Sequence, residues 1–157
     1  MVCLMVTRIL LCSDGSDASV AAIEAGSSLF SDSATFEIVM VVDGPDDADM
    51  VGASGHAGPA MSPEEFELAE RAAVAETERA LEGKAARLGL VDAARIMLRG
   101  DPGQAICKYA EEVSAAAIVV GSRGRSGLKR AVLGSVSDYV TRNAPCSVVV
   151  TPPTGIS

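Results

Sequence analysis

Short apolar segments recur along this chain, and longer segments separate each one from the next. Residues 7–13, 35–42 and 115–120 are clear examples, with isoleucine, leucine or valine at consecutive positions. A strand with one face in water would alternate apolar and polar residues, so consecutive apolar residues indicate strands that are covered on both faces. The longer segments carry apolar residues at helical spacing. The sequence therefore predicts a parallel sheet with helices on both sides.

The expected elements alternate along the whole chain. Strands are predicted at residues 7–13, 35–42, 93–98, 116–120 and 147–151, and helices at 16–30, 62–88, 101–113 and 135–143. This order predicts one α/β domain over residues 1–157, built on a five-stranded, parallel, doubly wound sheet of Rossmann-like type. In such sheets, ligands bind at the carboxyl ends of the strands, near the point where the strand order reverses.

Residues 43–62 interrupt this alternation. They are rich in glycine, aspartate, proline and serine, and they contain the only histidine of the chain, His56. This composition predicts a long irregular loop. Ser62 is expected to cap the helix that follows, because Pro63 and two glutamates occupy the first turn.

The charge balance and the aromatic content argue against two classes of partner. The chain has a net charge of −8 and only 3% aromatic residues, whereas nucleic-acid binding requires a basic face and stacking platforms. No apolar run reaches the roughly 20 residues of a membrane span, and the first residues lack the basic start of a signal peptide. We therefore expect a cytoplasmic protein that binds neither nucleic acid nor membrane. Metal-binding spacing is absent from the four cysteines, which are Cys3, Cys12, Cys107 and Cys146.

A glycine-rich segment follows the fourth predicted strand. Gly121 and Gly124 are separated by two residues, and nine further residues lead to Gly134 and Ser135. Glycines permit the close approach of backbone to a ligand, and Ser135 is expected to cap the last helix, whose first amides would attract phosphate. A plain glycine turn is the alternative. Four basic residues crowd into this segment of an acidic chain, namely Arg123, Arg125, Lys129 and Arg130.

Three acidic or basic residues near the strand ends leave two interpretations open. Asp14 follows the first strand directly, where its carboxylate would either accept hydrogen bonds from a base or ribose, or cap the following helix. Arg123 and Arg125 would either neutralise phosphate or remain solvated. A single loop histidine supplies no catalytic triad, and no pair of carboxylates stands out as acid and base. We therefore expect a binding protein and not an enzyme.

These motifs together resemble the universal stress protein family over nearly the whole chain. The specific pattern is G-x2-G-x9-G-[S/T], which Gly121, Gly124, Gly134 and Ser135 match. Further similarity lies in Asp14 after the first strand, in the Gly-Asp-Pro sequence at residues 100–102 and in the closing segment at 144–150. The resemblance implies the fold that is also described as adenine nucleotide alpha hydrolase-like.

The resemblance also implies a ligand, which is ATP or a related adenine nucleotide such as AMP, ADP or cAMP, with Mg²⁺ or Mn²⁺ held by the phosphates and no metal ligands from the protein. Asp14 would contact the adenosine end, and the backbone of Val41 would contact adenine. Gly121 and Gly124 would line the ribose and phosphates, and phosphate would bind at Gly134, Ser135 and Val136. A homodimer through the last strand, Ser147 to Thr151, is implied as well.

The expected function is that of a nucleotide-dependent regulatory module of the stress response, with a protein partner that the sequence does not identify. Two alternatives stay open. One is a dimeric scaffold that acts through protein contacts without nucleotide, and the other is a weak ATPase, for which the sequence shows no catalytic group.

Overall fold

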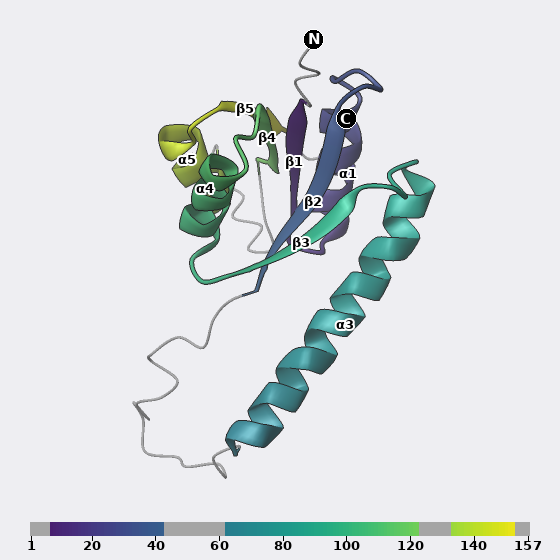
Figure 1. Cartoon of the computed structure of the whole chain (residues 1–157), viewed down its shortest axis with the longest axis vertical. Helices are drawn as coiled ribbons and strands as arrows, with labels where there is room; N and C mark the ends of the chain where they lie inside the picture. The colour runs from purple at the N-terminus through teal and green to yellow at the C-terminus, as the bar shows by residue number, and fades with distance from the viewer. Residues whose placement is uncertain (1–6, 43–61, 123–132, 153–157) are drawn as a thin grey trace, which may run out of the picture.

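The computed structural model describes residues 7–42, 62–122 and 133–152. Five parallel strands form one sheet in the order β3-β2-β1-β4-β5. The strands are β1 (Arg8–Ser13), β2 (Thr35–Val42), β3 (Ala94–Arg99), β4 (Ala117–Gly121) and β5 (Ser147–Thr151). The helices are α1 (Asp17–Ser27), α3 (Pro63–Arg87), α4 (Pro102–Glu112) and α5 (Ser135–Asn143). Figure 1 shows α4 and α5 together on one side of the sheet and α1 on the other, which confirms the predicted doubly wound α/β fold.

The buried residues of β1 alternate between two separate halves of the core. Ile9 and Leu11 pack in the half that includes Ile23 of α1, whereas Leu10 packs in the half that includes Ile106 of α4. All five side chains are at most 3% exposed. Because both faces of the strand are covered, both sets of positions must be apolar, which explains the consecutive apolar residues in the sequence.

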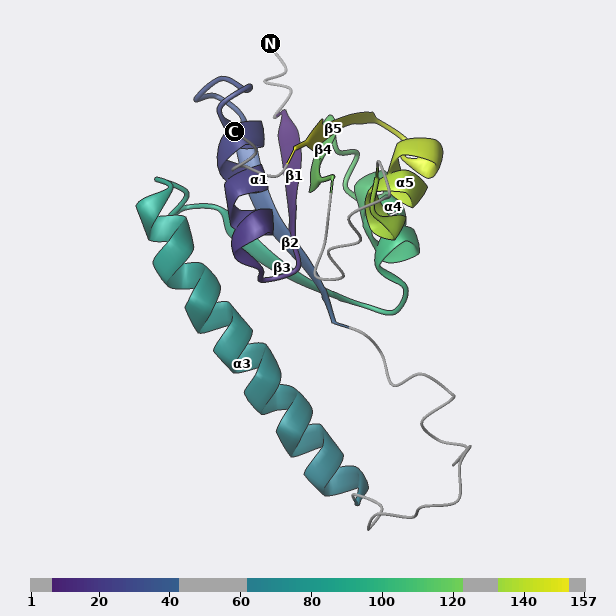
Figure 2. The ribbon, with the colours of Figure 1, turned by 180° about the vertical axis from the view of Figure 1, so that it is seen from behind.

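Only one end of α3 is close to the sheet. Ala85 is buried in the same half of the core as α1, and Leu88 packs against it just after the helix. The amino-terminal end of α3 extends away from the sheet in both views (Figures 1 and 2). Ser62 begins the helix with reciprocal hydrogen bonds, since its Oγ accepts from the Glu65 backbone at 3.2 Å and its own backbone donates to Glu65 Oε2 at 2.8 Å. The predicted cap at Ser62 is confirmed.

A buried polar cluster ties α4 to the amino-terminal part of the sheet. Glu37 of β2 is 7% exposed, and its Oε1 lies 2.9 Å from Nε of Arg8 on β1. The hydroxyl of Tyr109 on α4 donates to Glu37 Oε2 at 2.8 Å, while Arg8 Nη1 donates to the Val113 carbonyl at 2.9 Å. Burial, the hydrogen bond to Glu37 and its negative charge raise the pKa of Tyr109 to about 12.

Most predicted boundaries hold within a residue or two. The ranges of β2, α5 and β5 agree with the prediction, whereas β3 and β4 each lie one residue later, and α1 is shorter than residues 16–30. Residues 43–61 of the predicted loop at 43–62 lie outside the described residues. In the described parts of the chain, the helices are either too short or too polar to span a bilayer.

Candidate functional site

The strand order reverses at the carboxyl ends of β1 and β4, which is the edge where parallel sheets of this kind bind ligands. These two strands are neighbours in the sheet although about a hundred residues separate them in the chain. From β1 the chain passes to α1 on one face, and from β4 it passes to α5 on the other, so the order reverses between them. Leu11 pairs with Val119, and this register continued by two residues brings Ser13 level with Gly121. The segments that follow, Asp14–Ser16 and the glycine-rich segment, therefore start at the same place.

Hydrogen bonds within its own turn hold Asp14 at the end of β1. Its Oδ1 accepts from the Ser16 backbone at 3.0 Å and from the Ser16 hydroxyl at 2.5 Å. Ser16, and not Asp14, is the N-cap of α1, because Ser16 Oγ accepts from the Ser19 backbone at 3.2 Å. The helix-cap interpretation of Asp14 is therefore wrong. Its half-buried carboxylate is fixed at the carboxyl edge of the sheet.

Serine hydroxyls also hold the turn at residues 14–16 in place. The buried hydroxyls of Ser13 and Ser19 lie 2.9 Å apart in a hydrogen bond, and Ser13 Oγ also accepts from the Gly15 backbone at 3.1 Å. Gly15 has φ of +81°, a conformation that other residues adopt at a cost. The turn that presents Asp14 is thus preorganised by the residues around it.

Two backbone hydrogen bonds bring the start of α5 to the end of β4. The Ser122 backbone donates to the Thr151 carbonyl at 2.8 Å, which fixes the exit of β4 beside β5. The Gly134 backbone donates to the Ser122 carbonyl at 2.7 Å. Gly121 and Gly134, the first and last glycines of the sequence motif, therefore lie close together at this edge of the sheet.

The N-cap of α5 is Gly134, which corrects the expectation that Ser135 caps this helix. Ser135 already has helical backbone, since the Asp138 backbone donates to the Gly134 carbonyl at 2.9 Å. The backbone amides of the first three residues, Ser135, Val136 and Ser137, consequently have no acceptor within the helix, and they lie at the positive end of its dipole. Val136 packs its side chain into the core, so only its backbone amide is left for a ligand.

The end of β2 lies beside the turn that holds Asp14. Met40 pairs with Ser13, which puts Val41 level with Asp14 one residue further on. Val41 is half-buried and packs against the half of the core that α4 covers. Three predicted site residues, Arg123, Gly124 and Arg125, lie outside the described residues.

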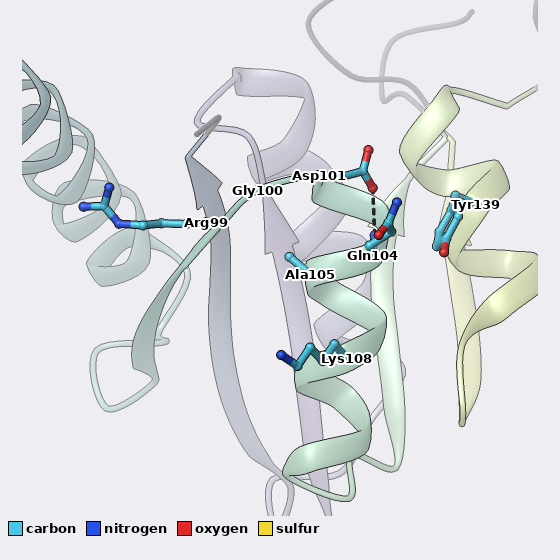
Figure 3. A pocket seen from close by; sticks show the side chains of 7 residues that line it. All are labelled: Arg99, Gly100, Asp101, Gln104, Ala105, Lys108 and Tyr139. Atoms are coloured by element: carbon cyan, nitrogen blue, oxygen red, sulfur yellow. Dashed lines mark hydrogen bonds between the residues drawn. The ribbon is translucent and has the colours of Figure 1, made fainter. Parts of the chain in front are cut away.

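An open cavity of about 420 Å³ lies nearby, at the carboxyl end of β3 (Figure 3). Its lining comes from β3, α4 and α5 and consists of Arg99, Gly100, Asp101, Gln104, Ala105, Lys108 and Tyr139. Asp101 caps α4 by accepting from the Gln104 backbone at 2.9 Å. The Gly-Asp-Pro sequence pointed to this edge, but no sequence signal identified Tyr139, because its place depends on how α5 packs against α4.

The described thiols and acids do not form a metal centre. Among residues 7–42, 62–122 and 133–152, no cluster of three or more His, Cys, Asp or Glu side chains has the geometry to hold a metal ion. Cys12, Cys107 and Cys146 are free thiols. Burial raises the pKa of all three, so they stay protonated and weakly nucleophilic at neutral pH.

Comparison with known sequences gives one family. The model of the universal stress protein family matches residues 5–152. Among curated proteins, universal stress protein Slr1101 of Synechocystis sp. is 49% identical over 53 residues, which is 34% of this chain and 49% of that protein. The matched segments span half or less of the curated relatives they come from.

Solved structures share the fold over almost the full chain. Universal stress protein UspA from Lactobacillus plantarum is 29% identical with a TM-score of 0.68, over 92% of this chain and 96% of that one. A universal stress protein in complex with cAMP is 22% identical with a TM-score of 0.62, over 92% and 95%. At that identity, the second likeness concerns the fold alone.

Proposed function

This chain belongs to the universal stress protein family, and from that premise we propose that it binds an adenine nucleotide at the carboxyl ends of β1 and β4. One observation carries the proposal. The Asp14 turn and Gly121 lie at neighbouring strand ends where the strand order reverses, and the hydrogen bond from Gly134 to Ser122 brings the first amides of α5 to the same edge, although these segments are distant in the sequence. A carboxylate at one end and helix amides at the other suit a ligand with a hydrogen-bonding base or ribose and an anionic tail.

In this proposal, the residues predicted from the sequence contact three parts of the nucleotide, which are the adenine base, the ribose and the phosphates. Asp14 accepts hydrogen bonds from the adenosine end, and the Val41 backbone meets adenine. Gly121 permits the close approach of ribose and phosphate, and the amides at Ser135 and Val136, which follow Gly134, bind phosphate. Arg123, Gly124 and Arg125 complete the phosphate side as predicted from the sequence.

ATP, ADP, AMP and cAMP all carry the adenine, the ribose and the phosphate that this edge of the sheet would bind. A structural neighbour of the same fold in complex with cAMP supports this ligand class. If the ligand carries a di- or triphosphate, Mg²⁺ or Mn²⁺ would be held mainly by phosphate oxygens, because Asp14 is the one predicted site residue with a carboxylate. The ion would neutralise phosphate charge.

The proposed biological role is that of a cytoplasmic, nucleotide-dependent module of the stress response, formed by residues 1–157 as one domain. In this proposal it forms a homodimer through β5, which is an edge strand of the sheet. A protein partner recognises the nucleotide-bound form. Binding rather than turnover is the proposed activity, since phosphoryl transfer needs a positioned nucleophile in addition to bound phosphates.

The nucleotide content of the protein as purified tests this proposal. The protein is denatured, and the released small molecules are separated by ion exchange and identified by mass. We expect an adenine nucleotide near one per chain, or binding of added Mg-ATP, ADP, AMP or cAMP by calorimetry. A protein that is empty and binds none of these would favour the nucleotide-free scaffold, whereas release of ADP from bound ATP over hours would favour the weak ATPase.

A further inference from the structure

The ring of Tyr139 on α5 lies directly against Gly103 on α4. A Cβ placed on Gly103 would lie 2.7 Å from Cδ1 of Tyr139, 2.8 Å from Cγ and 3.0 Å from Cβ. Carbon atoms do not approach this closely, so any other residue at position 103 would force the ring or the helix to move. Gly103 is buried in the structure, and the missing side chain is what allows the two helices to meet here.

This contact joins the first turn of α4 to the second turn of α5, since Tyr139 is the fifth residue of α5. Gly103 is the second residue of α4, two positions after the cap at Asp101. Tyr139 lies four residues after Ser135 and three after Val136, so all three share one side of α5. Figure 3 shows Tyr139 projecting from α5 toward the first turn of α4, where Gln104 lies. Tyr139 and Gly100 also line the same cavity at the carboxyl edge of the sheet.

The start of α5 is therefore fixed on two sides. On the side of the sheet, the Gly134 backbone donates to the Ser122 carbonyl at 2.7 Å. On the side of α4, the Tyr139 ring rests on Gly103. Two contacts at different points of one short helix fix its direction as well as its position, and the direction of α5 decides where its first amides point.

We propose that Tyr139, seated on Gly103, is a positioning residue that sets where the amides of Ser135 and Val136 lie relative to Asp14, and thereby sets the affinity for the phosphate end of the nucleotide. The inference rests on the proposed function. In this proposal, the contact acts through the direction of α5 and not by contact with the nucleotide. Hydrogen bonds to a phosphate depend steeply on distance and angle, so a small rotation of the helix weakens them.

The test compares two ligands that differ only in phosphate. Binding of ATP and of adenosine is measured by calorimetry for the wild type and for Gly103→Ala, Tyr139→Ala, Tyr139→Phe and the double variant Gly103→Ala/Tyr139→Ala. Gly83→Ala is the matched control, because nothing lies within 4 Å of a Cβ at Gly83 in α3. The melting temperature of each variant is recorded alongside, so that unfolded protein is recognised.

We expect Gly103→Ala and Tyr139→Ala to lower the affinity for ATP by about tenfold or more, which is the equivalent of one lost charge-assisted hydrogen bond. The affinity for adenosine should change by less than about threefold. In the Tyr139→Ala background, Gly103→Ala should lower ATP affinity less than it does in the wild type, because the ring that the new Cβ would clash with is gone. Tyr139→Phe, which keeps the ring, and Gly83→Ala should bind ATP as the wild type does.

The outcomes separate this inference from the proposed function. A wild type that binds neither ligand overturns the proposed function and this inference with it. A wild type that binds ATP, with folded Gly103→Ala and Tyr139→Ala variants of unchanged affinity, overturns this inference alone. Equal losses for ATP and adenosine would also overturn it, because they indicate general loosening of the fold. If Gly103→Ala does not fold, the comparison of Tyr139→Ala with Tyr139→Phe decides in the same way.

Discussion

At the scale of single residues, Asp14 offers the most direct test of the proposed site. Its carboxylate is held by Ser16, and Ser16 is the cap of α1. Replacing Asp14 by alanine should therefore remove a ligand contact while leaving the cap in place. We expect adenosine or ATP to bind about tenfold or more weakly, the loss of one hydrogen bond to a charged group, with a smaller effect on the melting temperature.

Ser16→Ala is the matched control for this variant. It removes the cap of α1 and should lower the free energy of unfolding by about 1 kcal/mol. Its melting temperature gives the effect of losing the cap, and its affinity is not used, because the Ser16 hydroxyl also holds the Asp14 carboxylate. Normal affinity in Asp14→Ala, together with a melting temperature lowered as far as in Ser16→Ala, would contradict the role proposed for Asp14.

The two caps at this edge show what the sequence does not resolve at the residue scale. Asp14, Ser16 and Asp17 all have side chains that suit an N-cap, and Gly134 and Ser135 are both acceptable at the other helix. The choice depends on which backbone first becomes helical, and that follows from how the chain leaves the strand. At α5 this is fixed by the bond from Gly134 to Ser122, which no local pattern shows.

At the scale of elements, the buried hydrogen bond between Tyr109 and Glu37 fastens α4 to β2. Tyr109→Phe leaves Glu37 Oε2 without its hydroxyl donor in a side chain that is 7% exposed. We expect the free energy of unfolding to fall by about 1–3 kcal/mol, measured by urea denaturation at pH 7. Tyr139→Phe, at a ring that is 37% exposed, is the control and should stay within about 0.5 kcal/mol of the wild type.

The same hydroxyl predicts a pH dependence at the alkaline end. The pKa of Tyr109 is about 12 in the folded protein, against an ordinary value of 10.0. A raised pKa means that the unfolded chain loses this proton first, so the stabilisation is complete below pH 10 and is lost as the pH rises toward 12. The difference in stability between the wild type and Tyr109→Phe should shrink over that range. A difference that stays constant from pH 9 to 12 would contradict the assignment.

The strand ends show where the sequence predicts elements well and where it does not. For β2 and β5 the apolar run and the strand coincide. Ala93 is apolar and buried, yet its backbone donates to the Leu90 carbonyl in a turn, so β3 starts one residue later than predicted. Gly121 still pairs with Thr151, which extends β4 into the expected loop. The burial of Glu37 could not be predicted from the sequence, because its hydrogen-bond partner Tyr109 lies 72 positions away.

At the scale of the whole molecule, the sequence predicts a parallel sheet covered on both sides, because the central strands β1, β2 and β4 are buried and carry consecutive apolar residues. No local sequence pattern shows the order of the strands, since that order depends on which strands pair across long stretches of chain. That order decides that Asp14 and Gly121 meet, because it places β1 beside β4. The sequence motif predicts residues of the proposed site, and the topology places two of them, Asp14 and Gly121, at neighbouring strand ends.

The strand order also governs assembly, because β3 and β5 are the two edges of the sheet. The proposed homodimer uses Ser147 to Thr151 of β5 and leaves β3 as an internal control on the other edge. We expect light scattering to give twice the 16.0 kDa mass of the chain. Hydrogen–deuterium exchange should show amides of β5 that become more protected as the protein concentration rises, while those of β3 do not change. A mass of one chain, or protection that rises at β3 instead, would contradict pairing through β5.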